Sequence, residues 1–459
     1  MKNIYKLVLL LAAVFVVSNA QSQGLYEQYR DPVSEGRRLE VYGVDLLSVD
    51  QFQTIGGDTI TDLNLNLNAD YRQWKFDSRV LVGGYFATGV NYNSLKVNSG
   101  NSVGRTDFAA LGFGGASYYF TPNQIYITGA LGLSYQRFNQ DTGTSGSISD
   151  YEGPGYLWGA VGYGRLYNAG TITTAKDVEE ALVRGGVMNS TSRFSNTVTL
   201  GIANLLKKRA YGDYDTKNHD DQDIAFFTDL QSLLQKEGVV SGPLTMAQTI
   251  RVYEAINNTR GRYVRYPRYT GIQAQIQAQY QLFNQTKNKP HDHYLSFDAV
   301  FGKPLSDQTQ LLLSGFFAMA LDSLASGNGP AAGFGGPFSF PSFLPFIPDR
   351  NNLDFFVRTN GTGLYGGSYI GGKDKLFGAR ADITHSINNR AGISGFASFI
   401  NLSPNTGDSR TLISGGARLD YNLTHWLTSY IRAGFDKETD RVLVYSIGAG
   451  FNWRVFGNN

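Results

Sequence analysis

The sequence contains no cysteine in its 459 residues. This absence excludes a disulfide framework, a thiolate metal site, a cysteine nucleophile and a lipid anchor on cysteine. Long hydrophobic runs are also missing, because no segment after the N-terminal one reaches the 18 apolar residues typical of a transmembrane helix. Charged residues are scarce, at 17%. The chain is therefore expected to be neither a disulfide-rich scaffold nor a helical membrane protein.

Residues 1–20 have the composition of a secretory signal peptide. Lys2 and Lys6 form its basic beginning, residues 7–17 form an apolar run, and residues 18–20 are small enough for cleavage. We expect the chain to be exported and this signal to be removed. Removal takes away two basic residues and no acids, so 38 of each remain and the mature chain is neutral.

Glycine, tyrosine and phenylalanine are abundant, with 54, 28 and 29 residues. Outside one central region, apolar and polar residues alternate, and residues 63–72 and 271–282 do so without error. Strict alternation predicts a strand with one apolar face and one wet face. Thirteen further segments show a noisier version, and many of them are 10 to 16 residues long. A transmembrane strand needs about 9–11 residues.

Short turns alternate with longer polar loops along the chain, and aromatic residues gather near the ends of the expected strands. In these features the chain resembles the outer-membrane β-barrel proteins of Gram-negative bacteria, over residues 35–170 and 268–456, as a porin-like class and not as one family. The resemblance implies an all-β transmembrane antiparallel barrel in the outer membrane. Fifteen strands are recognisable, and because such barrels have an even number, we expect about 14–16.

Residues 172–266 depart from this pattern. They carry 23 charged residues among 95, and their apolar residues recur at helical spacing. We expect four short amphipathic helices that form a small α-helical domain inserted into the barrel. Residues 21–171 then form the first part of the barrel, with about six strands, and residues 267–459 form the second. If the N-terminus is periplasmic, an even number of preceding strands predicts that the insertion lies in the periplasm as well.

Two wet strand faces are candidates for the lumen. Both are rich in amides, which suit either a passage for uncharged polar solutes or a side-chain network that fills the barrel. The candidate lumen residues are Asn64, Asn66, Asn68, Asp70, Arg72, Gln273, Gln275, Gln277, Gln279 and Gln281.

Residues 322–350 are rich in glycine, proline and phenylalanine. Proline and glycine resist regular strand pairing, and a large exposed apolar surface is rare without a partner. The segment is expected either to fold into the barrel mouth as a gate or ligand clasp, or to pack on the barrel rim. The gating candidates are Phe334, Phe338, Phe340, Phe343 and Phe346.

Basic and aromatic residues interleave where the helical region returns to the barrel. The favoured interpretation is anchoring at the membrane interface, with tyrosine at the headgroup level and arginine near lipid phosphates. A packed hinge between helices and barrel is the alternative, and an exported neutral chain argues against nucleic acid. The anchor candidates are Arg262, Tyr263, Arg265, Tyr266 and Arg268.

Signals for metal binding or catalysis are weak. His291 and His293 would share one strand face but have no evident third ligand. Residues 213–223 begin like a calcium loop but lack its later glycine and glutamate. His385 and His425 have no recognisable catalytic partners. We therefore expect no metal, no cofactor and no enzymatic activity.

The leading hypothesis is a transport-class outer-membrane channel with a restricted lumen, embedded in outer-membrane lipid. The alternative is a structural or assembly barrel whose periplasmic helices, within residues 172–266, dock an envelope protein. An outer-membrane hydrolase is a third, less favoured hypothesis. The sequence names no solute and no oligomeric state.

Overall fold

The computed structural model describes most of residues 23–453. The signal-peptide prediction for residues 1–20 and the gating prediction for residues 322–350 lie outside the described residues. Within 23–453, the segments left out are 43–46, 54–58, 98–101, 123, 142–146, 153–154, 212–213, 215–218, 258–265, 267, 284–293, 322–374, 389, 404–407, 424–426 and 440–442.

The described strands form one antiparallel sheet in which strands that follow one another along the chain pair as neighbours. They are β1 (Ser34–Tyr42), β2 (Leu47–Gln53), β3 (Thr59–Phe76), β4 (Val80–Val97), β5 (Ser102–Tyr119), β6 (Ile125–Asp141), β7 (Ser147–Glu152), β8 (Gly155–Gly164), β9 (Tyr167–Asn168), β10 (Tyr269–Phe283), β11 (Tyr294–Pro304), β12 (Thr309–Ala320), β13 (Lys375–Ser386), β14 (Ala391–Ser403), β15 (Arg410–Asn422), β16 (Leu427–Glu438) and β17 (Val444–Trp453).

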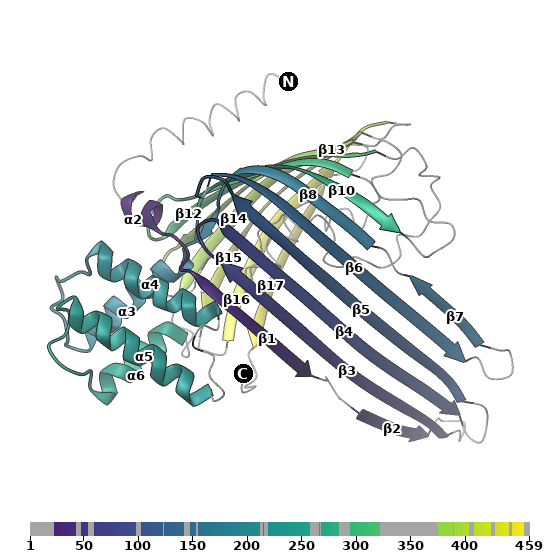
Figure 1. Cartoon of the computed structure of the whole chain (residues 1–459), viewed down its shortest axis with the longest axis horizontal. Helices are drawn as coiled ribbons and strands as arrows, with labels where there is room; N and C mark the ends of the chain where they lie inside the picture. Colours follow the sequence, from purple (N-terminus) through teal and green to yellow (C-terminus); the bar gives the residue numbers. More distant parts are fainter. Residues whose placement is uncertain are drawn as a thin grey trace.

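These seventeen strands occupy fourteen positions in the sheet. β1 and β2 both pair with the same side of β3. β7 and β8 share one side of β6, and β8 and β9 share one side of β10. In Figure 1 the sheet curves, so that β14 to β17 lie behind β3 to β6.

Several strands are longer than the alternation predicts. β3, β4 and β5 have 18 residues each and β6 has 17. Together with β2 and β7, they occupy much of residues 50–62, 93–105 and 139–153, which the sequence places in polar loops. Backbone pairing continues there although neither face is apolar, because ladder hydrogen bonds do not depend on side-chain polarity. These strands exceed the length needed to cross a membrane.

The sheet has an apolar outward face. On β10, Ile272, Ile276 and Tyr280 are exposed, whereas Gln273 and Gln275 between them are buried. Exposed large apolar residues alternate in the same way along β6, β8, β13 and β15. A soluble protein hides such residues, so this polarity is the one expected of strands that face lipid outside and polar groups inside.

Glycines and aromatic rings are paired across neighbouring strands. A Cβ at Gly162 would lie 2.3 Å from Cζ of Tyr126, its partner across the β6–β8 ladder. The same relation joins Gly378 to Phe316, Gly416 to Phe396, Gly415 to Phe435 and Gly450 to Tyr430. Each ring lies where a side chain would otherwise stand, as in aromatic rescue of strand glycines. This pairing accounts for part of the excess of glycine and aromatics.

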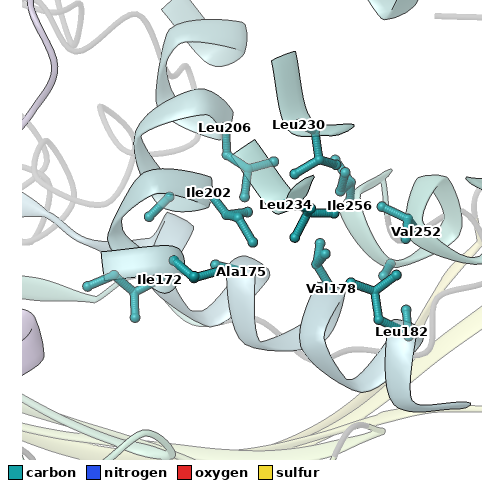
Figure 2. Packing of buried hydrophobic residues seen from close by; sticks show 14 of the residues in the cluster. Ile172, Ala175, Val178, Leu182, Ile202, Leu206, Leu230, Leu234, Val252 and Ile256 are labelled. Atoms are coloured by element: carbon teal, nitrogen blue, oxygen red, sulfur yellow. The ribbon is translucent and has the colours of Figure 1, made fainter. Parts of the chain in front are cut away.

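Four helices lie between β9 and β10: α3 (Gly170–Arg184), α4 (Asn196–Tyr211), α5 (His219–Lys236) and α6 (Met246–Asn257). α3 packs on α4 and α6, and α4 packs on α5. Their apolar residues converge on one core, which includes Val178, Ile202, Leu230, Leu234 and Val252 (Figure 2). A short helix, α2 (Gln23–Gln28), adds Tyr26 to it, and Tyr29 just after this helix joins the same core.

The helices join the sheet at the end where the turns are short. This short-turn end comprises the β3–β4, β5–β6, β11–β12 and β13–β14 connections, at residues 77–79, 120–124, 305–308 and 387–390. Asp77 and Asn388 each accept two backbone N–H groups of their own turn through a side-chain oxygen. Figure 1 shows α3 to α6 beside this end of the sheet.

Candidate functional site: the inward face and its short-turn end

An amide–tyrosine network lines the inward face of β6, β8 and β10. The Tyr126 hydroxyl donates to Oε1 of Gln275 at 2.9 Å and accepts from Nε2 of Gln273 at 3.2 Å. Nε2 of Gln275 donates to Oε1 of Gln277 at 3.2 Å. The three glutamines are 9%, 3% and 4% exposed in chain order. The network therefore satisfies buried amides internally.

Gly162 makes this network possible. It lies on β8 between Tyr126 of β6 and Gln275 of β10, and it is paired with both. Because it has no side chain, the Tyr126 ring lies over β8 and its hydroxyl reaches β10. The alternation along 271–282 does not reveal this, since the bridging tyrosine and the glycine lie more than a hundred positions earlier in the chain.

Two Arg–Asp pairs lie on the inward face. On β13, Nε and Nη2 of Arg380 donate to the Asp382 carboxylate at 2.6–3.0 Å. On β15, Nε of Arg418 donates to Oδ1 of Asp420 at 2.8 Å. Residues two apart on a strand share a face, so each arginine is held by the acid beside it.

Each of these arginines also lies over an aromatic ring of the next strand. The guanidinium carbon of Arg380 is 4.3 Å from the centroid of Phe396, and that of Arg418 is 4.3 Å from the centroid of Tyr430. The two units have the same construction, two strands apart. Stacking on the ring restrains the guanidinium perpendicular to its plane, and the hydrogen bonds to the carboxylate restrain it within that plane. These pairs are not evident from the sequence pattern, although the spacing Arg-x-Asp occurs in both strands.

The residues just before β10 reach distant strands. Arg268 is 2% exposed and donates from Nη2 to the Gln308 carbonyl at 2.9 Å and from Nη1 to Oγ1 of Thr384 at 3.3 Å. The Tyr266 hydroxyl donates to Oδ2 of Asp420 at 3.2 Å. We call Tyr266 and Arg268 the crossing segment.

The crossing segment lies on the inward side of the sheet. Thr384 and Asp420 are on β13 and β15, three and five positions from β10. Five positions correspond to about 24 Å along a sheet, so the contact is made across the inside of the curve. Ile383 and Leu419, next to these partners, are exposed on the outward face. The segment therefore covers part of the interior at the short-turn end.

This placement corrects the interfacial-anchor prediction for Arg268 and Tyr266. Arg268 is buried against protein carbonyls and Tyr266 bonds an inward carboxylate, so neither lies among lipid headgroups. The contacts are those of a packed hinge. Local composition alone does not separate the two cases, because both need arginine and tyrosine. Arg262, Tyr263 and Arg265 lie outside the described residues.

The helices are tied to the same end through charged groups of the N-terminal segment and a turn. Lys176 of α3 and Asp307 of the β11–β12 turn form an ion pair of 2.5 Å. Asp307 also accepts from the Tyr26 hydroxyl at 3.4 Å. Asp31 lies between Arg165, at 3.6 Å, and Lys207 of α4, at 3.8 Å. These contacts join helices, α2 and sheet into one packed end.

Burial changes the acidity of groups in this junction. Desolvation and the Asp420 carboxylate raise the pKa of Tyr266. Desolvation and Asp307 likewise raise the pKa of Tyr26. Desolvation lowers the pKa of Arg268. The two tyrosines therefore remain neutral hydrogen-bond donors well above the pH at which exposed tyrosine ionises.

The other predicted lumen residues are placed only by their backbone. Asn64, Asn66, Asn68, Asp70 and Arg72 lie in β3, and Gln279 and Gln281 lie in β10.

Nδ1 of His385 is 2.8 Å from Oγ1 of Thr309 on the neighbouring strand. Over the part of the chain that the structure describes, no three metal-ligating side chains come together. In that part no helix has the length and apolar character needed to cross a membrane.

The sequence matches no family model and no curated protein. Its structure is similar to outer-membrane β-barrel proteins. One is CdiB from Escherichia coli, with 10% identity, a TM-score of 0.32, and coverage of 94% of this chain and 68% of that one. Another is BamA from Haemophilus ducreyi lacking POTRA domains 1–3, with 10% identity, a TM-score of 0.29 and coverage of 96% and 78%. A third is the translocator domain of autotransporter NalP from Neisseria meningitidis, with 8% identity, a TM-score of 0.18 and coverage of 94% and 91%. At these values the likeness identifies no family for the chain.

Proposed function

We propose that the chain is an outer-membrane β-barrel of the transport class whose lumen is restricted at the short-turn end. The carrying observation is the polarity of the sheet, which is apolar outside and lined inside by amides and Arg–Asp pairs. Pairing of the β1–β2 strand with β17 would close the fourteen positions and leave no unpaired edge in lipid. The exported chain would then carry α3 to α6 on the periplasmic side.

The restriction is supported by the crossing segment. The hydrogen bonds of Arg268 and Tyr266 hold the residues before β10 across the inward side of the sheet. The Tyr126 network occupies part of the inward face. A lumen with fixed charges and a narrow end would pass small solutes and select among ions. We propose no enzymatic activity for the chain.

Planar lipid bilayers test conduction directly. The purified full chain is expected to show stepwise conductance, and Arg268→Gln combined with Tyr266→Phe is expected to raise it, because the crossing segment loses its contacts with β13 and β15. Wild-type and variant chains that both give no steps, although both insert into the bilayer, would overturn the channel proposal.

Ion selectivity tests the role of the Arg–Asp pairs. Arg380→Gln leaves Asp382 uncompensated and is expected to shift the reversal potential in a salt gradient toward cation selectivity. Asp382→Asn is expected to shift it toward anion selectivity. Lys236→Gln, at the exposed end of α5, is the control and should leave the reversal potential unchanged. Equal reversal potentials in wild type and the three variants would show that these pairs do not line the conduction path.

A docking function for the helices is the second candidate. Met246, Ile250 and Tyr253 form an exposed stripe on α6, at 82%, 50% and 38% exposure, and Ile224 of α5 is also exposed. Spacings of four and three residues place the stripe on one helix face. An envelope protein that buries this stripe would make the barrel an anchor.

Photo-crosslinking from the full chain in cell envelopes distinguishes this candidate. A crosslinking residue at position 250 is expected to give one discrete adduct, and the same residue at position 236 is expected to give none. The second substitution Met246→Asp should abolish the adduct at position 250. Identical patterns from positions 250 and 236 would exclude a specific docking surface on α6.

A further inference from the structure

A cleft of about 350 Å³ lies where α2 meets the outward face of the sheet. Its lining includes Tyr163, Ile272 and Phe301 from β8, β10 and β11, and the charged residues Glu27, Arg30 and Lys303. The volume is near the lower limit for sites that take small organic ligands. It is large enough for a polar headgroup but not for a long hydrocarbon chain as well.

The lining of the cleft carries charges of both signs. Arg30 is exposed, and its guanidinium carbon is 5.1 Å from the centroid of Tyr167. Its Nη1 donates to the carbonyls of Glu27 and Tyr29 at 2.6 Å, and a guanidinium carries five N–H donors, so its bonding capacity exceeds these two. Lys303 supplies a second cation and Glu27 an acid. Arg165, which also lines the cleft, is paired with Asp31 at 3.6 Å.

An apolar track leads away from the cleft along the wall. Ile272 and Tyr163 line the cleft and are 45% and 52% exposed. The outward positions that follow them along β10 and β8 are Ile276, Tyr280, Val161 and Leu157, and all are exposed. The cleft therefore stands at the boundary between the apolar wall and the polar short-turn end, where a lipid headgroup is found in a bilayer.

We propose that this cleft binds one glycerophospholipid with a phosphoethanolamine headgroup. Arg30 and Lys303 bind the phosphate through charge-assisted hydrogen bonds, Glu27 accepts from the ammonium group, and the acyl chains lie along the outward face of β8 and β10. Two cations and one carboxylate match a zwitterionic headgroup better than a purely anionic one. The proposal goes beyond the proposed function. It requires a lipid-facing wall but no conduction.

Native mass spectrometry of the full chain in detergent measures this binding. The probes are dihexanoyl phosphatidylethanolamine, dihexanoyl phosphatidylglycerol and inorganic phosphate. Wild type is expected to bind one phosphatidylethanolamine and to prefer it to phosphatidylglycerol. Arg30→Gln with Lys303→Gln is expected to weaken binding at least about tenfold, since each charge-assisted bond is worth more than one decade in affinity. Glu27→Gln is expected to remove the preference between the two lipids.

The matched control is Arg79→Gln with Arg390→Gln, which removes two exposed cations from turns at the same end. Binding by this control should equal that of wild type. An equal loss in control and cleft variants, or no loss in the cleft variant, would overturn the proposal. Displacement of the lipid by inorganic phosphate at the same concentration would also overturn it, because the site would then be one for free phosphate.

Each variant is also inserted into lipid vesicles, and its folding is read from the heat-dependent shift of the folded form on gels. This measurement separates loss of lipid binding at the cleft from failure to form a membrane barrel. A chain that inserts normally but retains no lipid contradicts only the cleft. A wild-type chain that does not insert contradicts the barrel itself.

Discussion

At the scale of single residues, the absence of a side chain decides where the inward aromatic rings lie. Tyr126 crosses β8 only because position 162 is glycine. Phe396, over which Arg380 stacks, lies against Gly416 in the same way. The groups around Tyr126 and Phe396 are therefore positioned by glycines that contribute only backbone to the ladder. This relation gives strand glycines a role in packing.

Gly162→Ala tests that role. The added Cβ would lie 2.3 Å from the Tyr126 ring, so the ring must move and the bonds to Gln273 and Gln275 must break. We expect a loss of about 1–3 kcal/mol in the free energy of unfolding. Gly159→Ala on the same strand is the control, because a Cβ there meets nothing within 4 Å. Urea unfolding in detergent, followed by tryptophan fluorescence, measures both, and equal stabilities would contradict the packing role.

At the scale of elements, the crossing segment and the helices depend on contacts with parts of the chain far away in sequence. Tyr266 bonds Asp420, and Tyr26 bonds Asp307. The helices add a core of their own, in which Leu230 and Leu234 of α5 meet side chains of α3 and α4 (Figure 2). Two kinds of interaction therefore hold this end: polar bonds to the sheet and apolar packing among helices.

The polar bonds predict an alkaline limit to stability. The pKa values of Tyr26 and Tyr266 are raised in the folded chain. Unfolded tyrosine loses its proton near pH 10, so the folded state binds more protons above that pH. Stability is therefore complete below about pH 10 and falls as the pH rises from there toward the folded pKa. Urea unfolding followed by ellipticity at 222 nm between pH 8 and 12 should show this fall. Tyr26→Phe with Tyr266→Phe should be less stable at pH 8 and should show a shallower fall, and an unchanged slope would contradict the assignment.

The apolar core predicts a contrast within one helix. Leu230 of α5 is fully buried, and Leu230→Ala is expected to cost about 2–5 kcal/mol. Ile224 of the same helix is 64% exposed, and Ile224→Ala is expected to cost within about 0.5 kcal/mol. Limited trypsin digestion should cut the helices of Leu230→Ala first and leave the sheet resistant. Equal resistance of both variants would contradict the core in Figure 2.

At the scale of the whole molecule, the polarity of the sheet is the reverse of that in a soluble protein. Large apolar residues cover the outward face, and amides and ion pairs line the inward one. Water on the outward face would leave this apolar surface unstable, whereas a hydrocarbon solvent stabilises it. In the proposed membrane setting, the surrounding lipid is therefore part of what fixes the fold.

The substitution Ile276→Arg distinguishes an outward face in water from an outward face in lipid. Ile276 is 57% exposed in the middle of β10, and in water an exposed substitution costs within about 0.5 kcal/mol. Facing lipid, the arginine is expected to cost about 2–4 kcal/mol. Folding in phospholipid vesicles, read from heat-dependent gel migration across a urea series, measures the difference. Val33→Arg, at a 67% exposed position before β1, is the control, and equal costs would contradict a lipid-facing wall.

The sequence by itself determined the period of the strands, because a strand that faces two solvents must alternate. The alternation along 271–282 indicates both β10 and its wet face, and helical spacing within 172–266 indicates helices, since each pattern is set by residues close together in the chain. Only the tertiary structure decided which distant groups meet. Tyr126 donates a hydrogen bond to Gln275, Tyr266 donates one to Asp420, and Arg380 stacks on the ring of Phe396. These contacts depend on the register and curvature of the sheet, which arise from all its strands together and which no local pattern records.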